Sequence, residues 1–194
     1  MFTLVMDTSM QYLVLGILDD HQVLAKLQRK VPKRQSEEIF VGLNTVLSEA
    51  KIDVDEIQQV VVTKGPGSYT GVRIALTIAK VFASLKKIPL YTLSSLQLLA
   101  GNESGTVILD ARSKRVYTAS FENGKQITKA SIKMIDELNL KEHLIGDLHL
   151  IGNQDIDVDL VEHFYELKNY WHLEEDIDHV KPDYLKANDA YLVR

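Results

Sequence analysis

The stretch that decides the fold is Thr63-Lys64-Gly65-Pro66-Gly67-Ser68-Tyr69-Thr70-Gly71-Val72-Arg73. Three glycines and a proline separate a β-branched run before the stretch from a helical pattern after it. Glycine permits positive φ angles and close backbone approach. The free N–H groups of a helix that begins near Thr70 can bind an anion. The stretch therefore predicts a strand, a tight loop and a helix, with phosphate as the natural ligand of the loop.

One other interpretation of this loop is open. It can be a tight strand-to-helix turn that Ser68 or Thr70 caps without any ligand. A P-loop fits poorly, because its last glycine is followed by Lys and then Ser or Thr, whereas Val72 and Arg73 follow Gly71.

The elements around the loop alternate in a regular way. Apolar runs predict strands, and apolar stripes at helical spacing predict helices. This order gives a five-stranded mixed sheet with helices on its faces, a layered α/β arrangement. The expected elements are strands over 2–6, 12–18 and 23–31, a helix over about 35–51, a strand over 59–63, a helix over about 70–86 and a strand over 89–92.

The opening pattern of the chain returns about a hundred residues later. A shift of 103 positions places Asp7 on Asp110 and Asp20 on Asn123, where Asn123-Gly124 is a strong hairpin signal. Two hairpins can look alike by chance, but a duplicated domain is the favoured interpretation. It predicts a first lobe over residues 1–102 and a shortened second lobe over residues 103–194, with the boundary near 101–105. The repeated strands are Thr106–Leu109 and Val116–Phe121.

The pattern weakens beyond about Met134. Leu148–Ile151 is expected to be a short strand, and Leu160–Leu167 fits a helix. The acidic stretch Glu174-Glu175-Asp176 is interpreted as a solvated surface.

Composition limits the function classes. The chain has 194 residues, 45% hydrophobic and 25% charged, which is ordinary for a globular protein. No apolar run is long enough to span a bilayer, so a cytoplasmic location is expected. The absence of cysteine excludes disulfides, thiolate zinc sites and a cysteine nucleophile. A net charge of −5 gives no overall basic field, so another subunit is expected to hold any RNA substrate.

Two aspartates are candidates for chemistry. Asp7 and Asp110 each end the first strand of a half and are expected to face a cleft, where such folds place metal and phosphate contacts. Together they could hold Mg²⁺ through water or act as acid and base. The favoured alternative is that each caps a tight turn. The six histidines form no metal-binding pattern, so neither a metal site nor a catalytic residue is expected.

The predicted second helix carries two apolar stripes. Val72, Ala75 and Leu76 belong to one, while Ile74, Ile78 and Val81 lie on nearly the opposite side. A second apolar face needs a cover, either the first helix of the same lobe or a partner subunit. The candidate partner interface is Ile39, Leu43, Val46, Arg73, Ile74, Ile78, Val81 and Leu85.

Residues 65–74 resemble the signature of the TsaB (YeaZ) family, in its variant with Tyr in the aromatic position. Other features stand in the matching order over residues 1 to about 120, and the region 125–180 matches loosely and is short. These features are Asp7-Thr8-Ser9, Ser36-Glu37, Leu109-Asp110-Ala111-Arg112 and, near the end, Pro182-Asp183-Tyr184-Leu185.

The resemblance implies a duplicated actin-like, Hsp70-like ATPase fold of the ribonuclease H-like class, which agrees with the repeat. Fold alone does not give function. In the catalytic paralogue TsaD, two histidines on the first helix bind a metal, and that subunit transfers threonylcarbamoyl to tRNA. The corresponding stretch here, residues 33–40, has no histidine, and Gln35 stands where many relatives keep a single one.

The resemblance further implies a noncatalytic scaffold that pairs with TsaD, with TsaE and ATP hydrolysis completing the cycle. The product would be threonylcarbamoyl on adenosine 37 of tRNAs that read ANN codons. Alone the chain would be a homodimer, it would meet tRNA through the complex and no membrane, and it would hold no cofactor tightly. ATP or ADP would sit at the complex interface, and a weak intrinsic ATPase activity stays open.

The alternative is a small ATP-dependent phosphotransferase or hydrolase of the same fold, with Asp7 and Asp110 around Mg·ATP. The residues expected near nucleotide or phosphate are Asp7, Thr8, Ser9, Gly65, Gly67, Ser68, Thr70, Gly71 and Asp110.

Overall fold

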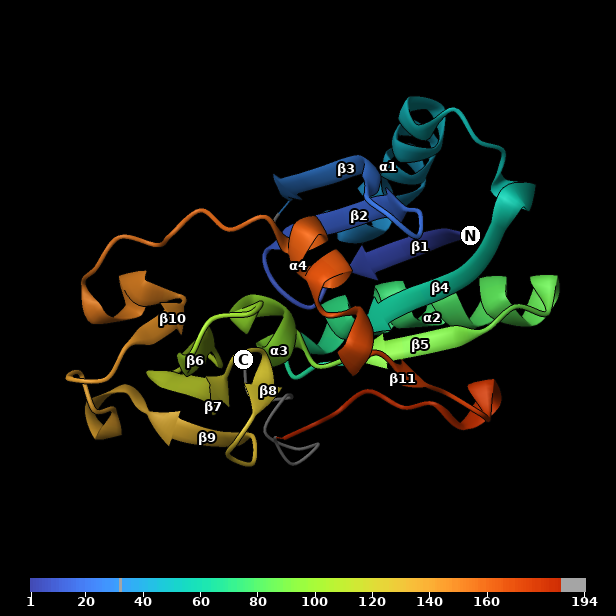
Figure 1. Cartoon of the computed structure of the whole chain (residues 1–194). Coiled ribbons are helices and arrows are strands. Elements are labelled where there is room, and N and C mark those ends of the chain that lie inside the picture. The colour runs from blue at the N-terminus through green and yellow to red at the C-terminus, as the bar shows by residue number, and fades with distance from the viewer. Residues whose placement is uncertain (32, 186–194) are drawn as a thin grey trace.

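The computed structural model describes residues 1–31 and 33–185, which form two β-sheets with helices on their faces (Figure 1). The first sheet has the order β11-β5-β4-β1-β2-β3, and the second has β10-β6-β7-β8 with β9 paired to β7. The first sheet contains β1 (Phe2–Asp7), β2 (Tyr12–Leu18), β3 (Val23–Lys30), β4 (Ile57–Thr63), β5 (Leu90–Leu93) and β11 (His172–Leu173). The second contains β6 (Gly105–Asp110), β7 (Arg115–Glu122), β8 (Lys125–Gln126), β9 (Ser131–Met134) and β10 (Leu144–Gly146). The α-helices are α1 (Gln35–Ala50), α2 (Tyr69–Lys86), α3 (Ser95–Ala100) and α4 (Leu160–Glu166). Short 3-10 helices lie at Val54–Glu56, Ile135–Glu137, Leu148–Ile151, Lys168–Tyr170 and Ile177–His179.

The first sheet is mixed, as predicted. β1, β2 and β3 form an antiparallel meander, while β4 runs parallel to β1 and β5 parallel to β4. β1 is the central strand and is buried from Thr3 to Asp7, which explains why its sequence is a continuous apolar run rather than an alternating one.

The second sheet repeats the centre of the first. β7 is antiparallel to β6 and β10 is parallel to β6, just as β2 and β4 flank β1. β1 and β6 occupy equivalent positions at the predicted shift. Asn123 and Gly124 form the turn between β7 and β8 with φ angles of 49° and 76°, the conformation that this dipeptide favours. The predicted two-lobed ribonuclease H-like fold is confirmed.

The first lobe also uses the end of the chain. β11 pairs antiparallel with β5, so the first sheet has six strands and the prediction of five is wrong by one. α4 packs on β2 and β3 of the same sheet. Residues 160–173, which the sequence analysis assigned to the second lobe, therefore lie against the first. A strand of two residues is too short to give a pattern in the sequence.

One predicted strand is a helix. Leu148–Ile151 is a 3-10 helix, and the strand that pairs with β6 is β10, four residues earlier. Both segments are short apolar runs, and runs of this length do not distinguish strand from helix. The predicted helix over 160–167 is confirmed as α4, which Asp159 caps by accepting hydrogen bonds from the N–H groups of Val161 and Glu162.

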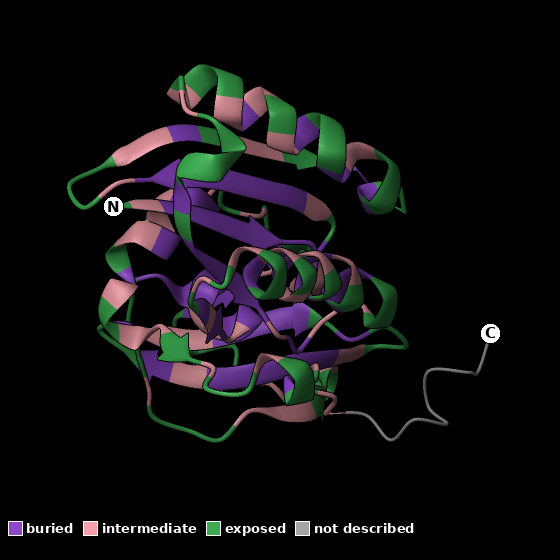
Figure 2. Cartoon of the chain, turned by 90° about the vertical axis from the view of Figure 1, so that its right-hand side faces the viewer, coloured by how far each residue is buried: buried purple, intermediate pink, exposed green. Residues whose placement is uncertain are grey.

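Three hydrophobic clusters stabilise the described part of the chain, two of them around the first sheet and a small one at Ile108, Val116, Leu144 and Leu148 of the second lobe. α1 and α2 cover one face of the first sheet and form a core with it. The opposite face packs with α3 and α4 against the second sheet, in a core that contains Val61, Tyr117 and Phe164. Figure 2 shows the central strands as buried and the outer surfaces of the helices as exposed. α1 and α2 thus lie side by side on an outer face of the molecule.

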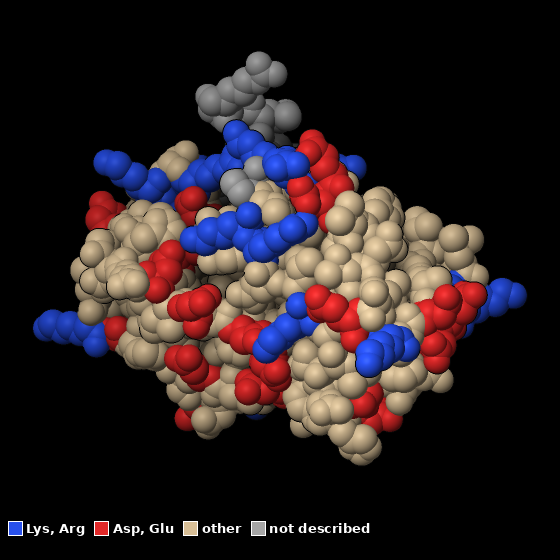
Figure 3. Space-filling model, turned by 90° about the horizontal axis from the view of Figure 1, so that it is seen from above, with Lys and Arg blue, Asp and Glu red and all other residues tan. Residues whose placement is uncertain are grey.

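Charges of both signs mix on the surface. Seen from above, Lys and Arg side chains alternate with Asp and Glu (Figure 3). Ion pairs such as Arg29–Glu38 and Lys26–Asp159 neutralise several of the basic residues of β3. The surface therefore agrees with the absence of an overall basic field. Across residues 1–31 and 33–185, every helix is too short or too polar to cross a bilayer.

Candidate functional site

The glycine-rich loop packs directly on the end of β1. Ser68 N–H donates to the Ser9 carbonyl oxygen at 2.7 Å. Thr8 Oγ1 donates to the Gly71 carbonyl oxygen at 2.6 Å and accepts from Ala75 N–H at 3.1 Å. The predicted residues Thr8, Ser9, Ser68 and Gly71 are therefore brought together, by contacts within the chain.

Close backbone approach explains two of the glycines. A Cβ atom on Gly67 would lie 2.4 Å from the Ser9 carbonyl oxygen, and one on Gly71 would lie 2.1 Å from the Thr8 carbonyl oxygen. Gly65 has a φ angle of 105°, a backbone conformation that residues with a side chain rarely adopt. The glycines thus let β1 and the loop approach each other closely.

Ser68 caps α2, as one interpretation of the sequence predicted. Its Oγ accepts a hydrogen bond from Gly71 N–H at 3.2 Å and so satisfies one of the free donors at the helix start. Thr70 is exposed and lies at the surface between α1 and α2. Phosphate binding at the loop stays a prediction.

Asp7 is fully buried, so the expectation that it faces an open cleft is wrong. Its Oδ1 accepts from Ser9 N–H at 3.1 Å, from Ser9 Oγ at 2.5 Å and from Thr63 Oγ1. Its Oδ2 has no hydrogen-bond partner in the described part of the chain. Burial raises the pKa of this carboxyl, although the hydrogen bonds from Ser9 and Thr63 oppose the shift. The carboxyl group is a structural element of the turn after β1.

Asp110 has the same local geometry in a different environment. Its Oδ1 accepts from Arg112 N–H, two residues further on, at 2.6 Å, which parallels the bond between Asp7 and Ser9. Unlike Asp7, it is exposed. Its own N–H donates to Asp147 Oδ2 at 2.7 Å. Both aspartates therefore cap a turn, the favoured interpretation, with Asp7 buried and Asp110 exposed.

An apolar groove runs between α1 and α2. It has a volume of about 510 Å³. Its lining residues are Ser36, Ile39, Phe40, Tyr69, Thr70, Arg73, Ile74, Thr77 and Ile78. Four of the eight predicted interface residues line this groove, namely Ile39, Arg73, Ile74 and Ile78.

Five of the predicted interface residues lie on α2. Arg73, Ile74 and Ile78 line the groove, and Val81 and Leu85 continue its apolar surface along α2, with 53% and 79% of their surface exposed. These positions are accessible to a partner.

Residues of α1 are less accessible than predicted. Ile39 lies in the groove wall but is fully buried, and Leu43 is half-buried against the core. Val46 is fully buried, so its assignment to the interface is wrong. α1 is oriented so that these side chains face the sheet. Burial of such a side chain stabilises the fold by about 1.5–3 kcal/mol.

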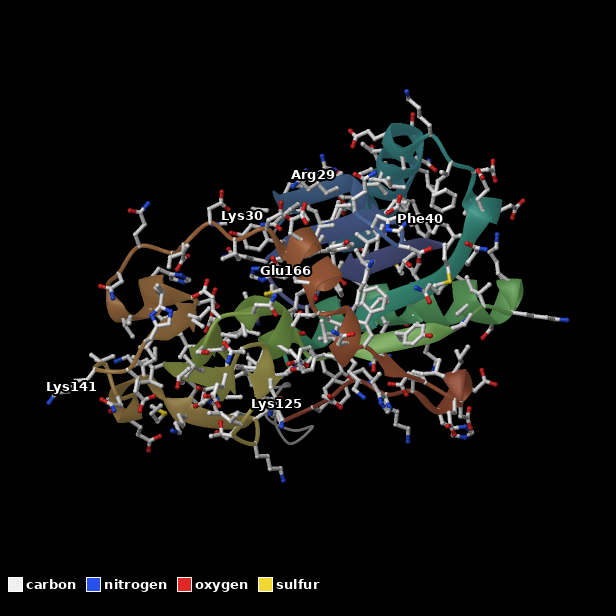
Figure 4. The ribbon with its side chains drawn as sticks, in the orientation of Figure 1. Arg29, Lys30, Phe40, Lys125, Lys141 and Glu166 are labelled. Carbon is white, nitrogen blue, oxygen red and sulfur yellow. The ribbon has the colours of Figure 1, made fainter. Side chains whose placement is uncertain are left out.

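Two aromatic groove residues were missed, besides the polar residues Ser36 and Thr77. Phe40 stands on α1 with 61% of its surface exposed (Figure 4), and Tyr69 begins α2 with 38% exposed. Both were visible in the sequence, Phe40 in the apolar stripe of the first helix and Tyr69 in the glycine-rich signature. The sequence carries no signal for their exposure, which depends on how each helix packs on the sheet.

Acidic and histidine residues give no further site. Within residues 1–31 and 33–185, no group of three or more His, Asp or Glu side chains is placed to hold a metal ion. Glu174 was expected to be solvated, but its Oε1 accepts from Thr92 Oγ1 at 2.5 Å and lies 3.3 Å from Lys64 Nζ. It fixes β11 to the first lobe, while Glu175 and Asp176 are exposed as predicted.

Comparison with known proteins adds the family. The family model of TsaD, tRNA N6-adenosine threonylcarbamoyltransferase, matches residues 29–147, more than half of the chain. The tRNA threonylcarbamoyladenosine biosynthesis protein TsaB of Bacillus subtilis is 35% identical over 127 residues, which cover 63% of this chain and 56% of that protein. The chain belongs to the TsaD family, in its TsaB (YeaZ) branch.

Other TsaB relatives agree over similar segments. TsaB of Buchnera aphidicola from Acyrthosiphon pisum is 29% identical over 112 residues, 54% of this chain and 51% of that protein. The chain therefore spans about half the length of the curated TsaB proteins it matches. The structure of YeaZ from Pseudomonas aeruginosa superimposes with a TM-score of 0.75 at 18% identity, over 95% of this chain and 99% of that chain, and so shares the fold.

Two of the segments on which the resemblance was based meet in space. Pro182–Leu185 lies against the glycine-rich loop, where Asp183 N–H donates to the Lys64 carbonyl oxygen at 2.7 Å. The ring of Tyr184 stacks on Tyr69, with centroids 5.2 Å apart. The end of the described chain therefore borders the groove between α1 and α2.

Proposed function

We propose that this chain is a noncatalytic subunit in the synthesis of threonylcarbamoyladenosine in tRNA, and that it pairs with TsaD through the groove between α1 and α2. The observation that carries the proposal is the apolar groove itself, at the position where the sequence predicted a partner. A continuous apolar surface on a protein of this size marks an interaction site.

The family match supports TsaD as the occupant. The TsaD model matches residues 29–147, a range that includes all of α1 and α2. TsaD thus has a counterpart of this helix pair. Two proteins with the same fold can pair about a pseudo-twofold axis, so that the helix pair of one covers the helix pair of the other, as in an isologous dimer. Without TsaD, a second copy of this chain covers the groove in the same way.

The geometry at β1 supports a noncatalytic role. Asp7 is buried and bonded within its turn, and the glycine-rich loop packs on the backbone of Thr8 and Ser9. In our proposal TsaD transfers threonylcarbamoyl to adenosine 37 of tRNAs that read ANN codons, and TsaE and ATP hydrolysis complete the cycle in the cytoplasm. Nucleotide binds at the interface of the complex, and tRNA is held by the complex rather than by this chain alone.

A small phosphotransferase is the competing function. It would need Asp7 and Asp110 around Mg·ATP, but one of them is buried and the other is exposed. Phosphoryl transfer depends on positioning and on charge stabilisation around the phosphates. The present geometry of the two aspartates does not favour that chemistry.

Light scattering on the eluate of a size-exclusion column tests the proposal. The purified chain is run alone, with TsaD of the same organism, and with TsaD, TsaE and ATP. We expect a heterodimer in the mixture. Ile78→Glu places a charge in the groove and is expected to weaken pairing at least about 10-fold, because the charge must be desolvated at the interface.

Ile127→Glu is the matched control. Ile127 is an exposed isoleucine of the second lobe, 56% exposed, and its replacement should leave pairing unchanged. Separate elution of the folded chain and TsaD, with TsaE and ATP present, would show that the proposed pairing is wrong. The isolated chain would then be assayed for phosphoryl transfer.

A further inference from the structure

The segment Pro182–Leu185 is fixed beside the start of α2. In addition to the bond from Asp183 N–H to Lys64, a Cβ atom on Gly65 would lie 3.1 Å from the Asp183 carbonyl oxygen, so the two backbones are in close contact. The Tyr184 ring stacks on Tyr69 with an interplanar angle of 26°. The glycine at position 65 thus admits the distant segment as well as forming the loop.

A further set of contacts holds the approach to this segment. Lys80 of α2 donates from Nζ to the carbonyl oxygens of Asp178 and Val180, at 2.8 and 3.1 Å. Val180 is buried in the core that α1 and α2 share with the first sheet. Tyr184 therefore reaches Tyr69 from a backbone that α2 itself anchors.

Tyr69 in turn positions a charged residue of the groove. Arg73 Nη1 donates to Tyr69 Oη at 2.7 Å, and the guanidinium lies 5.3 Å from the centre of the Tyr69 ring. Both residues line the groove. Tyr184, Tyr69 and Arg73 thus form a continuous series of contacts from the C-terminal segment to the groove.

We propose that Tyr184 is a positioning residue for partner binding, because it holds Tyr69 and Arg73 in the arrangement that TsaD contacts. This inference rests on the proposed function and deepens it by assigning a role to a segment that is distant in the sequence from both groove helices. Ordering a long side chain at an interface costs free energy, and a stack formed before binding removes part of that cost. Aromatic and arginine side chains are also the residues that most often dominate binding energy.

Affinity measurements with TsaD test the inference. Tyr184→Ala removes the stack and is expected to weaken binding about five-fold, the effect of losing one aromatic pair. Tyr184→Phe keeps the ring and should bind like the wild type. Tyr170→Ala is the matched control, since Tyr170 is a half-buried tyrosine packed in the core between the sheets, and its loss should not alter binding even if it lowers the melting temperature.

The outcomes separate the two proposals. If the wild-type chain does not bind TsaD, the proposed function falls and the role of Tyr184 falls with it. If the wild type binds and Tyr184→Ala binds equally well, the positioning role is overturned while the proposed function stands. Equal weakening by Tyr184→Phe and Tyr184→Ala would also overturn it. If Tyr184→Ala is poorly folded, Tyr184→Leu supplies bulk without an aromatic ring and gives the same comparison.

Discussion

At the scale of single residues, Asp7 is a buried acid whose environment sets the sign of a pH effect. Burial raises its folded-state pKa above the ordinary value of 3.8. A carboxyl with a raised folded-state pKa stabilises the fold fully below its unfolded pKa, and this contribution is lost as the pH rises through the folded-state pKa. We expect Asp7→Asn to gain stability relative to the wild type as the pH rises from about 4 to about 8.

Urea unfolding of both proteins across that pH range measures the difference. Asp19→Asn is the control, because Asp19 is half-buried and its pKa is lowered, first by the hydrogen bond from the His21 N–H. The stabilising contribution of Asp19 is present above pH 3.8 and is lost as the pH falls, so its pH dependence has the opposite sign to that of Asp7. A stability difference for Asp7→Asn that is constant with pH would contradict the raised pKa.

Gly71 is the residue at which the loop and β1 come closest. Gly71→Ala would place a methyl group against the Thr8 carbonyl oxygen, which belongs to a turn that cannot yield freely because Thr8 also bonds α2. We expect a loss of about 3 kcal/mol in the free energy of unfolding. Ser84→Ala, on the exposed surface of the same helix, should change it by less than about 0.5 kcal/mol. Equal effects of the two variants in urea unfolding would show that the close approach of Gly71 to Thr8 does not affect stability.

At the scale of elements, β11 depends on one glutamate. Glu174 bonds Thr92 of β5 and contacts Lys64 at the start of the glycine-rich loop. Glu174→Ala leaves the partly buried Thr92 hydroxyl and Lys64 ammonium groups without this partner, and should lower the free energy of unfolding by about 1–3 kcal/mol. We expect faster hydrogen exchange in β11 and in residues 181–185, and unchanged exchange in the second sheet.

The exposed neighbour Glu175 provides the control, since Glu175→Ala removes the same group where the side chain is solvated. Hydrogen exchange, measured by mass spectrometry on both variants, tests whether Glu174 holds β11. If the two variants exchange alike over residues 172–185, Glu174 does not hold this strand.

Sequence analysis predicted the elements of the first hundred residues well, because their patterns are long and regular. α1 and α2 each carry an apolar stripe over four turns or more, β1 and β2 are mostly apolar runs, and β4 contains a β-branched run. β11 and the 3-10 helix Leu148–Ile151 were missed because two to four residues hold no period.

The candidate site was predicted less completely, since it depends on burial. The identity of Asp7 is clear in the sequence, but its inaccessibility comes from the loop and helix that pack on it. In the same way, the stripe that contains Val46 and Phe40 indicates a helix, and the sheet alone determines which of the two is exposed.

At the scale of the whole molecule, the two lobes share a core and should unfold together. Val61 of the first sheet and Tyr117 of the second belong to one cluster that also contains Phe164 of α4. A fragment of residues 1–102 would expose the face of the first sheet that α4 and the second sheet cover. We expect this fragment to show no cooperative thermal transition by circular dichroism, whereas the whole chain shows one.

Mixing the fragment with a second fragment of residues 103–194 provides the control. Recovery of a cooperative transition in the mixture would show that the missing contacts, rather than damage to the first fragment, cause the loss. A cooperative transition of residues 1–102 alone would show that the first lobe is independent.

The pairing of β11 with β5 has a consequence for synthesis on the ribosome. β5 ends at Leu93 and its outer neighbour begins at His172, so at ordinary translation speeds the edge of β5 waits roughly 4 to 16 s for its partner strand. An unpaired strand edge is a template for association with other chains. The nascent protein is therefore most exposed to aggregation while residues 94–172 are being made, and any messenger RNA that ends before codon 172 would produce a chain that keeps this edge open permanently.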